Sequence, residues 1–203
     1  MAKRILKFVL HGFFLLLVLP AAALSGFGRW KLFYGIFANW YALAPGVPGD
    51  YLRIAFYRLT LAECSLASRI SFGSFFGHAE ASLGEGVYIG SYCVLGKTVI
   101  GERTQIASGV QILSGRRQHS RDESGRISGS ERGTFAPVVI GPDCWIGAAA
   151  IVMADVGAGS TIGAGSVVSR PIPPGSTAVG SPARVIKTAA GEANLEAGAS
   201  HDA

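Results

Sequence analysis

The chain has 203 residues, of which 49% are hydrophobic and only 15% are charged, and its formal net charge is +5. That length suits one domain of ordinary size with appendages. The charge is uneven, because residues 1–69 carry eight Lys or Arg against two acidic residues (+6) and the remainder carries ten against eleven (−1). Since the basic excess accompanies an apolar, aromatic segment, the composition favours an anionic membrane surface as partner and argues against nucleic acid.

The N-terminal stretch over residues 5–24 is twenty residues long and has Lys7 and His11 as its only ionisable side chains. At about 1.5 Å per residue, a helix of this length can cross a bilayer. A cleaved secretory signal is the alternative, because three alanines at 21–23 resemble a cleavage site. The aromatic residues that follow fit the bilayer interface and favour a retained membrane anchor over residues 1–49.

Residues 32–44 are short for a second span, and both a re-entrant hairpin and an interfacial helix fit them. Whether this region spans, re-enters or lies on the membrane stays open. The following PGVPG is expected to stop any helix. Apolar residues at helical spacing then predict an amphipathic linker helix over residues 50–69, with Arg53 and Arg58 turned away from its apolar face. We expect residues 1–60 to contact membrane lipids.

A six-residue period begins at residue 83 with LGEGVY and IGSYCV, and it returns at residue 140 with IGPDCW and IGAAAI. The spacing slips between residues 95 and 100 and between 152 and 156. Glycine recurs too often for a helix. The period predicts a mainly β solenoid in which the apolar residue of each unit points inward, glycine makes the corner, and three units form one triangular coil.

The repeats, with WIG at 145–147, IGAGSVVSR at 162–170 and PIPPGSTAVGSPARVIK at 171–187, resemble the hexapeptide-repeat acyltransferases. The likeness is greatest to the galactoside and maltose O-acetyltransferase-like group, here of a membrane-anchored polysaccharide acetyltransferase type. It covers about residues 70–188 and implies a left-handed parallel β-helix, a homotrimer and acetyl-CoA as acyl donor. Residues 189–203 are predicted to be a disordered tail.

A polar stretch over residues 114–137 interrupts the repeat. In the family such a loop carries a catalytic histidine, and GRRQHS at 115–120 puts His119 in that place. A sugar hydroxyl attacks a thioester only when a base removes its proton, and neutral imidazole suits that work near pH 7. Asp122 is a candidate to orient the ring or to stabilise the imidazolium.

The resemblance also implies that CoA lies in a groove between neighbouring subunits. Ala148 and Ala164 would offer backbone groups to the pantetheine arm, and the Ala148 N–H is the candidate donor to the oxyanion. Trp145 is expected to pack at the subunit junction. The other candidate cofactor-binding residues are Ser169 and Arg170, flanking the outer part of the arm, and Arg184 and Lys187, which would meet the CoA phosphates.

His78 and Tyr92 are the candidate acceptor residues. His78 lies early in the solenoid, and Tyr92 is close to Gly90, the position at which the galactoside enzymes present an acceptor-binding Asn. No metal is expected, because the domain has too few histidines for the zinc site of a carbonic anhydrase on this fold. The three cysteines are an odd number at wide spacing, which favours small buried hydrophobes over a disulfide framework: Cys64, Cys93 and Cys144.

Together these features predict an acetyl-CoA-dependent O-acetyltransferase that acts on a hydroxyl of a cell-surface saccharide or its lipid-linked precursor, with His119 as general base. The anchor implies the bacterial inner membrane, and acetyl-CoA implies a catalytic domain facing the cytoplasm. Two alternatives stay open. One is the same chemistry on an amino sugar or on serine, and the other is a non-catalytic β-helical scaffold of a polysaccharide assembly.

Overall fold

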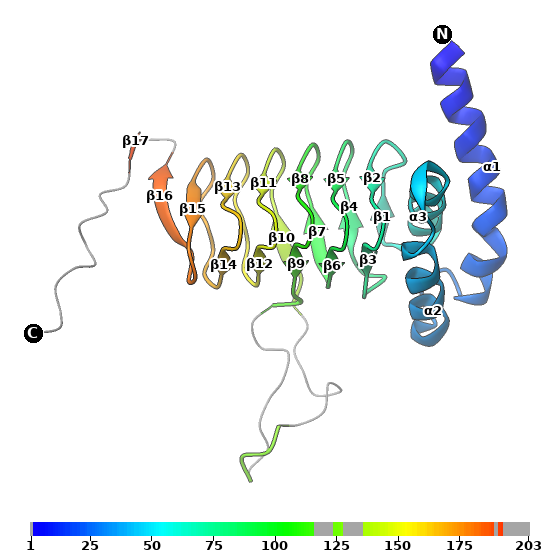
Figure 1. Cartoon of the computed structure of the whole chain (residues 1–203). Helices are drawn as coiled ribbons and strands as arrows, with labels where there is room; N and C mark the ends of the chain where they lie inside the picture. The colour runs from blue at the N-terminus through cyan, green and yellow to red at the C-terminus, as the bar shows by residue number, and fades with distance from the viewer. Residues whose placement is uncertain (1, 116–123, 128–135, 189–190, 193–203) are drawn as a thin grey trace, which may run out of the picture.

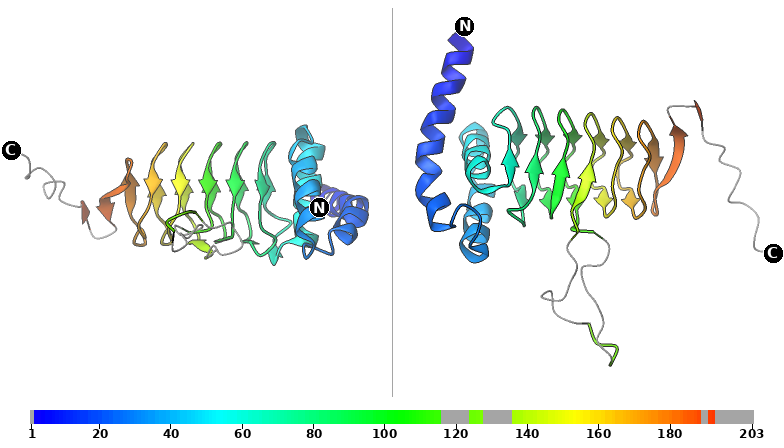
Figure 2. Two further views of the ribbon diagram at one scale, coloured as in Figure 1. Left: turned by 90° about the horizontal axis from the view of Figure 1, so that it is seen from below. Right: turned by 180° about the vertical axis from the view of Figure 1, so that it is seen from behind.

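Three helices lead into a row of short strands that coil along one axis in the computed structural model, which describes residues 2–115, 124–127, 136–188 and 191–192 (Figure 1). The helices gather at one end of the row and the chain finishes at the other end, as the views in Figure 2 agree. They are α1 (Ala2–Leu24), α2 (Lys31–Ala42) and α3 (Gly46–Thr60).

The chain visits three sheets in turn, and the strands within the solenoid are parallel. Sheet A contains β1 (Glu63–Cys64), β4 (Ser82–Leu83), β7 (Thr98–Ile100) and β10 (Val138–Ile140). Sheet C contains β3 (Phe75–Phe76), β6 (Val94–Leu95), β9 (Gln111–Ile112), β12 (Ile151–Val152) and β14 (Val167–Val168). Sheet B contains β2 (Arg69–Ile70), β5 (Tyr88–Ile89), β8 (Gln105–Ile106), β11 (Trp145–Ile146), β13 (Thr161–Ile162), β15 (Thr177–Val179) and the antiparallel β16 (Arg184–Thr188) and β17 (Gly191–Glu192). This arrangement is a parallel β-helix, so the predicted mainly β fold class is confirmed.

The inward residue of each six-residue unit is buried, as the period predicts. Ile89, Ile106 and Ile146 are each 0% exposed and stand in register on successive strands of sheet B. Fully burying such a side chain stabilises a fold by roughly 1.5–3 kcal/mol. Stacked rows of this kind form the core, and each coil covers the apolar row of its neighbour.

The departures from six-residue spacing fall at one corner, where the chain passes from sheet C to sheet A. The inward residues on either side of this corner are, coil by coil, Phe76 and Leu83, Leu95 and Ile100, Ile112 and Ile140, Val152 and Val156, and Val168 and Ile172. We call this corner the C–A edge: residues 77–81, 96–97, 113–137, 153–155 and 169–171. The B–C edge is the corner between sheets B and C: residues 71–74, 90–93, 107–110, 147–150 and 163–166.

Small hydroxyl residues fill the corners and join one coil to the next. The Ser74 hydroxyl donates to the carbonyl of Gly90 at 2.6 Å and accepts the N–H of Cys93 at 2.8 Å. Thr104 makes the equivalent pair of bonds with Gly141 and Cys144. Because backbone groups inside a corner have no water to bond, these hydroxyls meet a need that an alanine would leave unmet.

Arg53 is fully buried, although the sequence placed it away from the apolar face of its helix. Its guanidinium donates to the carbonyls of Tyr41 at 3.0 Å, in the last turn of α2, and of Ala44 at 2.7 Å, just beyond that helix. It also donates to the carbonyl of Ile70 at 2.8 Å in the first coil. The last carbonyls of a helix lack an N–H partner within it, and a fork of five donors can supply one. Arg53 therefore joins α2, α3 and the solenoid.

Three boundaries differ from the sequence-based expectation. Helix α3 begins within PGVPG, at Gly46, because a proline in the first turn removes only an N–H that has no acceptor inside the helix. The solenoid begins at β1, before residue 70, because Cys64 already occupies an inward position. Residues 191–192 of the expected tail form β17, which pairs with β16.

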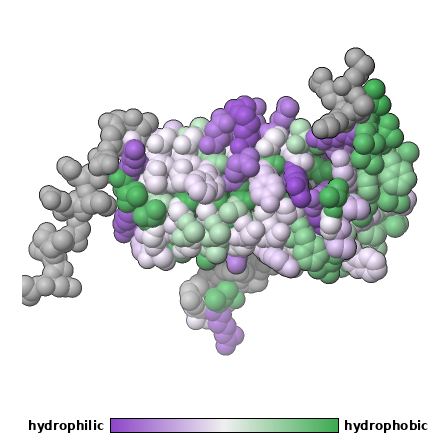
Figure 3. Space-filling view, turned by 45° about the horizontal axis from the view of Figure 1, so that its top comes forward, coloured by the Kyte–Doolittle hydropathy of each residue, from purple (hydrophilic) through white to green (hydrophobic). Residues whose placement is uncertain are grey.

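Within the described residues, the stretch Ile5–Leu24 is a helix long and apolar enough to cross a bilayer, by length and composition only. In its most apolar part, 17% is buried inside the protein. Helix α1 packs on α3 through one face, where Phe14 stacks on Tyr51 with ring centroids 5.2 Å apart. Figure 3 shows the apolar surface of α1 at the end of the molecule. The exposed large apolar residues of this end, here called the apolar end face, include Ile5, Phe8, Phe13, Leu16 and Leu17 of α1, Phe27, and Leu32, Ile36 and Trp40 of α2.

Candidate functional site

The polar insertion is rooted in the solenoid at two neighbouring residues on the C–A edge. A Cβ on Gly115 would lie 3.5 Å from Ala136, so the two ends of the insertion are in contact. Lys97, at the same edge of the second coil, bonds to both flanks of the insertion: its N–H donates to the Ser114 hydroxyl at 2.8 Å, and its carbonyl accepts the N–H of Val138 at 3.0 Å. The solenoid thus continues without a break across the two ends of the insertion.

His119 and Asp122 lie outside the described residues. The structure describes the two residues at which the loop that carries them leaves and rejoins the solenoid, Gly115 and Ala136, here called the foot of the insertion. Asp155, at the same edge of the next coil, is exposed and accepts the N–H of Val139 at 2.8 Å. Its carboxylate is a further acidic group beside the loop, and the sequence analysis had not singled it out because its place depends on how the coils stack.

His78 lies at the same edge, in the first coil. Desolvation lowers the pKa of His78 below its usual value, and the charges of Lys31 and Lys97 lower it further, while Glu80 opposes them. The His78 Nδ1 is 4.0 Å from the Glu80 carboxylate. His78, Lys97 and the foot of the insertion therefore follow one another along the C–A edge over three successive coils.

A cavity of about 540 Å³ opens beside His78, between the turn that joins α1 to α2 and the first coil. Arg29 and Lys31 come from the helical side, and His78 and Glu80 come from the coil. The turn is held close to the coil, since a Cβ on Gly28 would lie 2.3 Å from the Thr60 carbonyl oxygen. Sequence reasoning missed Arg29 and Lys31 as site residues because it treated them only as flanking charges of a membrane segment.

The B–C edge holds a different group of the predicted residues. Ala148 and Ala164 are exposed at stacked positions of this edge, and the Ala148 carbonyl accepts the N–H of Gly165 at 2.8 Å. The Ala148 N–H has no hydrogen-bond partner in the part of the chain that the structure describes. Tyr92 belongs to the same edge, is 64% exposed and has a positive φ of 59°.

Within one chain, the structure does not bring all the predicted residues together. Ser169 and Arg170 lie on the C–A edge, one sheet away from Ala148 and Ala164. Likewise His78 lies on the C–A edge and Tyr92 on the B–C edge. An acyl donor that contacts the residues predicted to bind it on both edges would have to cross sheet C or lie between two subunits.

Trp145 lies on the outer side of sheet B, between Gln105 and Thr161 of the neighbouring strands. Its side chain is 59% exposed. A large aromatic ring left this exposed is typical of an interaction surface.

Arg184 and Lys187 are both exposed on β16, the antiparallel strand that follows the last parallel strand of sheet B. The β15–β16 pairing shifts register between Thr177 and Ala178, so the two cations stand on either side of an irregularity. Residues three apart in a regular strand face opposite sides, and such a shift relaxes that alternation.

The cysteines are free and buried, as predicted. Burial raises the pKa of the Cys64 thiol to about 12, and it also raises the pKa values of Cys93 and Cys144. Protonated thiols of this kind are poor nucleophiles and poor metal ligands. Among the described residues, no cluster of three or more His, Cys, Asp or Glu could hold a metal ion.

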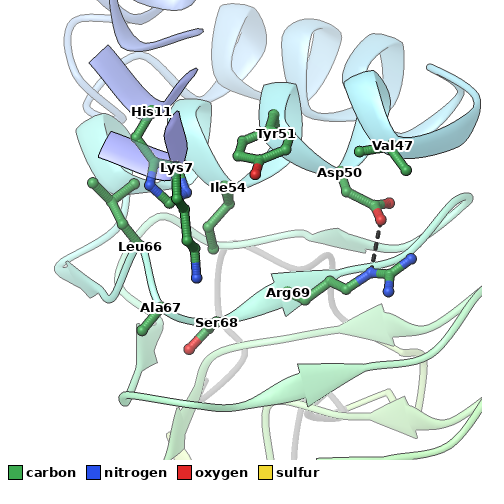
Figure 4. Close-up of a pocket in the computed structure, with 10 residues that line it drawn as sticks. All are labelled: Lys7, His11, Val47, Asp50, Tyr51, Ile54, Leu66, Ala67, Ser68 and Arg69. Atoms are coloured by element: carbon green, nitrogen blue, oxygen red, sulfur yellow. Dashed lines mark hydrogen bonds and ion pairs between the residues drawn. The ribbon is translucent and has the colours of Figure 1, made fainter. Parts of the chain in front are cut away.

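A second cavity, of about 340 Å³, is lined by residues of α1, α3 and the first coil (Figure 4). Lys7 and His11 of α1 line it, and the Lys7 side chain extends toward Ser68. Opposite them, Arg69 pairs with Asp50 at 2.7 Å. The two ionisable side chains of the apolar stretch thus face the protein, on the side away from the apolar end face.

Comparison with known proteins gives this architecture a class. Residues 137–170 match the family described as bacterial transferase hexapeptide (six repeats). The chain is 42% identical over 90 residues to a protein of Schizosaccharomyces pombe named as an acetyltransferase, and 41% identical over 109 residues to nodulation protein L of Rhizobium meliloti. These alignments cover 43% and 51% of this chain and 42% and 57% of the relatives, so the chain spans about half the length of the curated relatives it matches.

Solved structures agree. A maltose O-acetyltransferase from Clostridium difficile has a TM-score of 0.66 and 25% identity, covering 78% of this chain and 85% of that one. A hexapeptide-repeat acetyltransferase from Vibrio cholerae shares the fold at a TM-score of 0.55 and 20% identity, covering 78% and 89%. The repeat, the fold and the named relatives are those of the hexapeptide-repeat acyltransferases, which confirms the family resemblance seen in the sequence.

Proposed function

We propose that the chain is an acetyl-CoA-dependent O-acetyltransferase that acts on a hydroxyl of a cell-surface saccharide or its lipid-linked precursor. His119 acts as general base, taking the proton of the attacking hydroxyl while that oxygen bonds to the thioester carbon. The tetrahedral oxyanion accepts a hydrogen bond from the Ala148 N–H, and its collapse expels the CoA thiolate, which takes up a proton. The observation that carries this proposal is the polar insertion, which leaves an otherwise unbroken coil at the C–A edge and bears His119.

The placement of the predicted residues on two edges supports a homotrimer. The loop foot is on the C–A edge and the Ala148 N–H is on the B–C edge, so two adjacent subunits can supply what one chain keeps apart. The exposed Trp145 on sheet B offers apolar area for such a contact. CoA would then lie in the groove between subunits, with Arg184 and Lys187 meeting its phosphates.

The apolar end face supports attachment to the bacterial inner membrane, with the catalytic domain in the cytoplasm where acetyl-CoA is made available. Residues 1–60 supply both the exposed apolar side chains and the basic excess that an anionic leaflet attracts. Because Lys7 and His11 face the first coil, α1 fits a position in the plane of the interface better than one across the bilayer. An acceptor held in the same membrane would meet the enzyme more often than a soluble one.

The test is acetyl transfer by the detergent-solubilised full chain, read as release of free CoA thiol. His119→Ala should keep CoA binding and lose about 10²–10⁴-fold in turnover, which is the usual contribution of a general base. His201→Ala removes a histidine from the C-terminal tail and is the matched control. Undiminished turnover in His119→Ala would contradict the mechanism, and failure of the wild-type chain to bind acetyl-CoA would favour a scaffold.

A further inference from the structure

The cavity beside His78 is lined by basic side chains that the catalytic step does not use. Arg29 and Lys31 line it, and Lys97 is near enough for its charge to act on His78. Among the described residues, none of these three cations has an ion pair, and Glu80 is the one acidic residue of the lining. The two cations of the lining and the nearby Lys97 outnumber the single Glu80 carboxylate, and this excess of positive charge favours a ligand with negative charge.

The cavity also has an apolar side that continues onto the apolar end face. Phe27 and Leu61 line it, and Phe27 is itself 51% exposed at the turn between α1 and α2. Leu32, next to Lys31, is 72% exposed. A ligand whose charged group lies between Arg29 and Lys31 can therefore keep an apolar chain against the same surface that we place in the membrane.

Its position fits the acceptor side of the reaction. The cavity and the foot of the insertion lie on the same C–A edge, separated by the second coil, and neighbouring coils are about 4.8 Å apart. The distance along the edge from His78 to the foot of the loop is thus about 10 Å, which is the length of a sugar or two. The candidate groups for CoA lie further along the solenoid, toward its C-terminal end (Figure 1).

We propose that this cavity binds the phosphate of a membrane-borne, amphipathic phosphate ester, which is the carrier end of the saccharide acceptor. Arg29 and Lys31 hold the phosphate, the apolar chain lies on the end face, and the attached saccharide extends along the C–A edge toward the foot of the insertion. The inference rests on the proposed function in assigning this ligand as the acceptor, whereas the binding of the phosphate ester can be measured without any transfer.

The experiment measures binding to the full chain in neutral dodecylmaltoside micelles, which have no surface charge of their own. The probes are a short-chain isoprenyl monophosphate, the corresponding isoprenol and inorganic phosphate. We expect the isoprenyl phosphate to bind at least tenfold more tightly than either other probe and to shift the His78 imidazole signal in NMR. Arg29→Gln and Lys31→Gln should each weaken binding about fivefold to tenfold, and Arg103→Gln, which removes the same charge from another edge, should change it less than twofold.

Three results would overturn the proposal: equal binding of isoprenol, equal binding of inorganic phosphate, or equal weakening by Arg103→Gln and the two cavity variants. Transfer assays separate this failure from that of the enzyme. If the wild type binds isoprenyl phosphate as expected and transfers acetyl to no acceptor, the proposed function fails and the cavity stands. If Arg29→Gln and Lys31→Gln acetylate an isoprenyl-phosphate-linked sugar with an unchanged KM, the cavity fails and the enzyme stands.

Discussion

The Asp50 carboxylate bridges two arginines, Arg53 inside the protein and Arg69 at its surface. Arg53 is fully buried, and burial lowers its pKa while the hydrogen bond and charge of Asp50 act in the opposite direction. Arg69 stands at the start of β2. The pair Asp50–Arg53 thus joins the helical layer to the first coil through one buried cation.

We expect Arg53→Met to lower the free energy of unfolding by about 3–5 kcal/mol, the usual cost of breaking a buried ion pair from one side. It would leave the carbonyls of Ala44 and Ile70 without their guanidinium donor, while the Tyr41 carbonyl would keep the N–H of Ala44. Arg53→Lys should recover little, because an ammonium cannot reproduce the guanidinium fork. Urea unfolding followed by circular dichroism measures the change, and a shift below 1 kcal/mol would show that Arg53 is not a structural link.

Trp145→Glu should convert the proposed trimer to a monomer, because it puts a charge where an exposed ring offers apolar contact. Trp145→Phe keeps the apolar contact and should remain trimeric. Light scattering after gel filtration in detergent distinguishes the two. A trimeric Trp145→Glu would remove sheet B from the subunit interface.

Replacing both Arg184 and Lys187 by alanine should raise the KM for acetyl-CoA roughly tenfold and leave kcat nearly unchanged, because exposed cations near a phosphate contribute modestly and equally to ground and transition states. Arg103→Ala is the matched control on the A–B corner, where Arg103 pairs with Asp143. An unchanged KM in the double variant would place the CoA phosphates elsewhere.

His78 should titrate below pH 6.5, because desolvation and the charges of Lys31 and Lys97 disfavour its protonated form. When the pKa of a histidine is lower in the folded state than in the unfolded state, the histidine costs no stability at a pH above its unfolded-state pKa, because it is neutral in both states. Stability is lost as the pH falls below about 6.5 and through the folded-state pKa. NMR titration measures the pKa directly, and Lys97→Ala should raise it. A His78 pKa at or above 6.5 in the wild type would contradict the assignment.

The proposed in-plane position of α1 predicts that Ala2→Cys, at the N-terminal end of the helix, and Asp202→Cys are labelled by an impermeant maleimide from the cytoplasmic side only. The native cysteines are buried and give a low background. Labelling of Ala2→Cys from the opposite side would show that α1 spans the bilayer. Phe8→Glu, on the apolar end face, should lower vesicle binding at least about tenfold, whereas Val99→Glu on the solenoid should not.

The sequence predicted the solenoid well because its signal is local: an apolar residue every six positions and a glycine after it. Ile106 and Ile146 are buried where that period puts them. Arg53 was misplaced for the opposite reason, since its partners include Ile70, which only the packed fold brings near. Lys31 of the cavity and the nearby Lys97 were missed for the same reason, because they are far apart in the chain and their charges act together on His78 only once the turn packs on the coils.

The spacing between inward residues is six at two corners of each coil and varies only at the third. The rise from one coil to the next is therefore constant along the solenoid. Each coil adds about 4.8 Å between the apolar end face and whatever is inserted at the C–A edge. The insertion after β9 therefore leaves the solenoid at a distance from the apolar end face that is set by the number of coils before it, and adding or deleting one such coil would move Gly115 and Ala136 by one step. With the proposed membrane attachment, the number of coils thus sets how far from the lipid surface the loop that bears His119 begins.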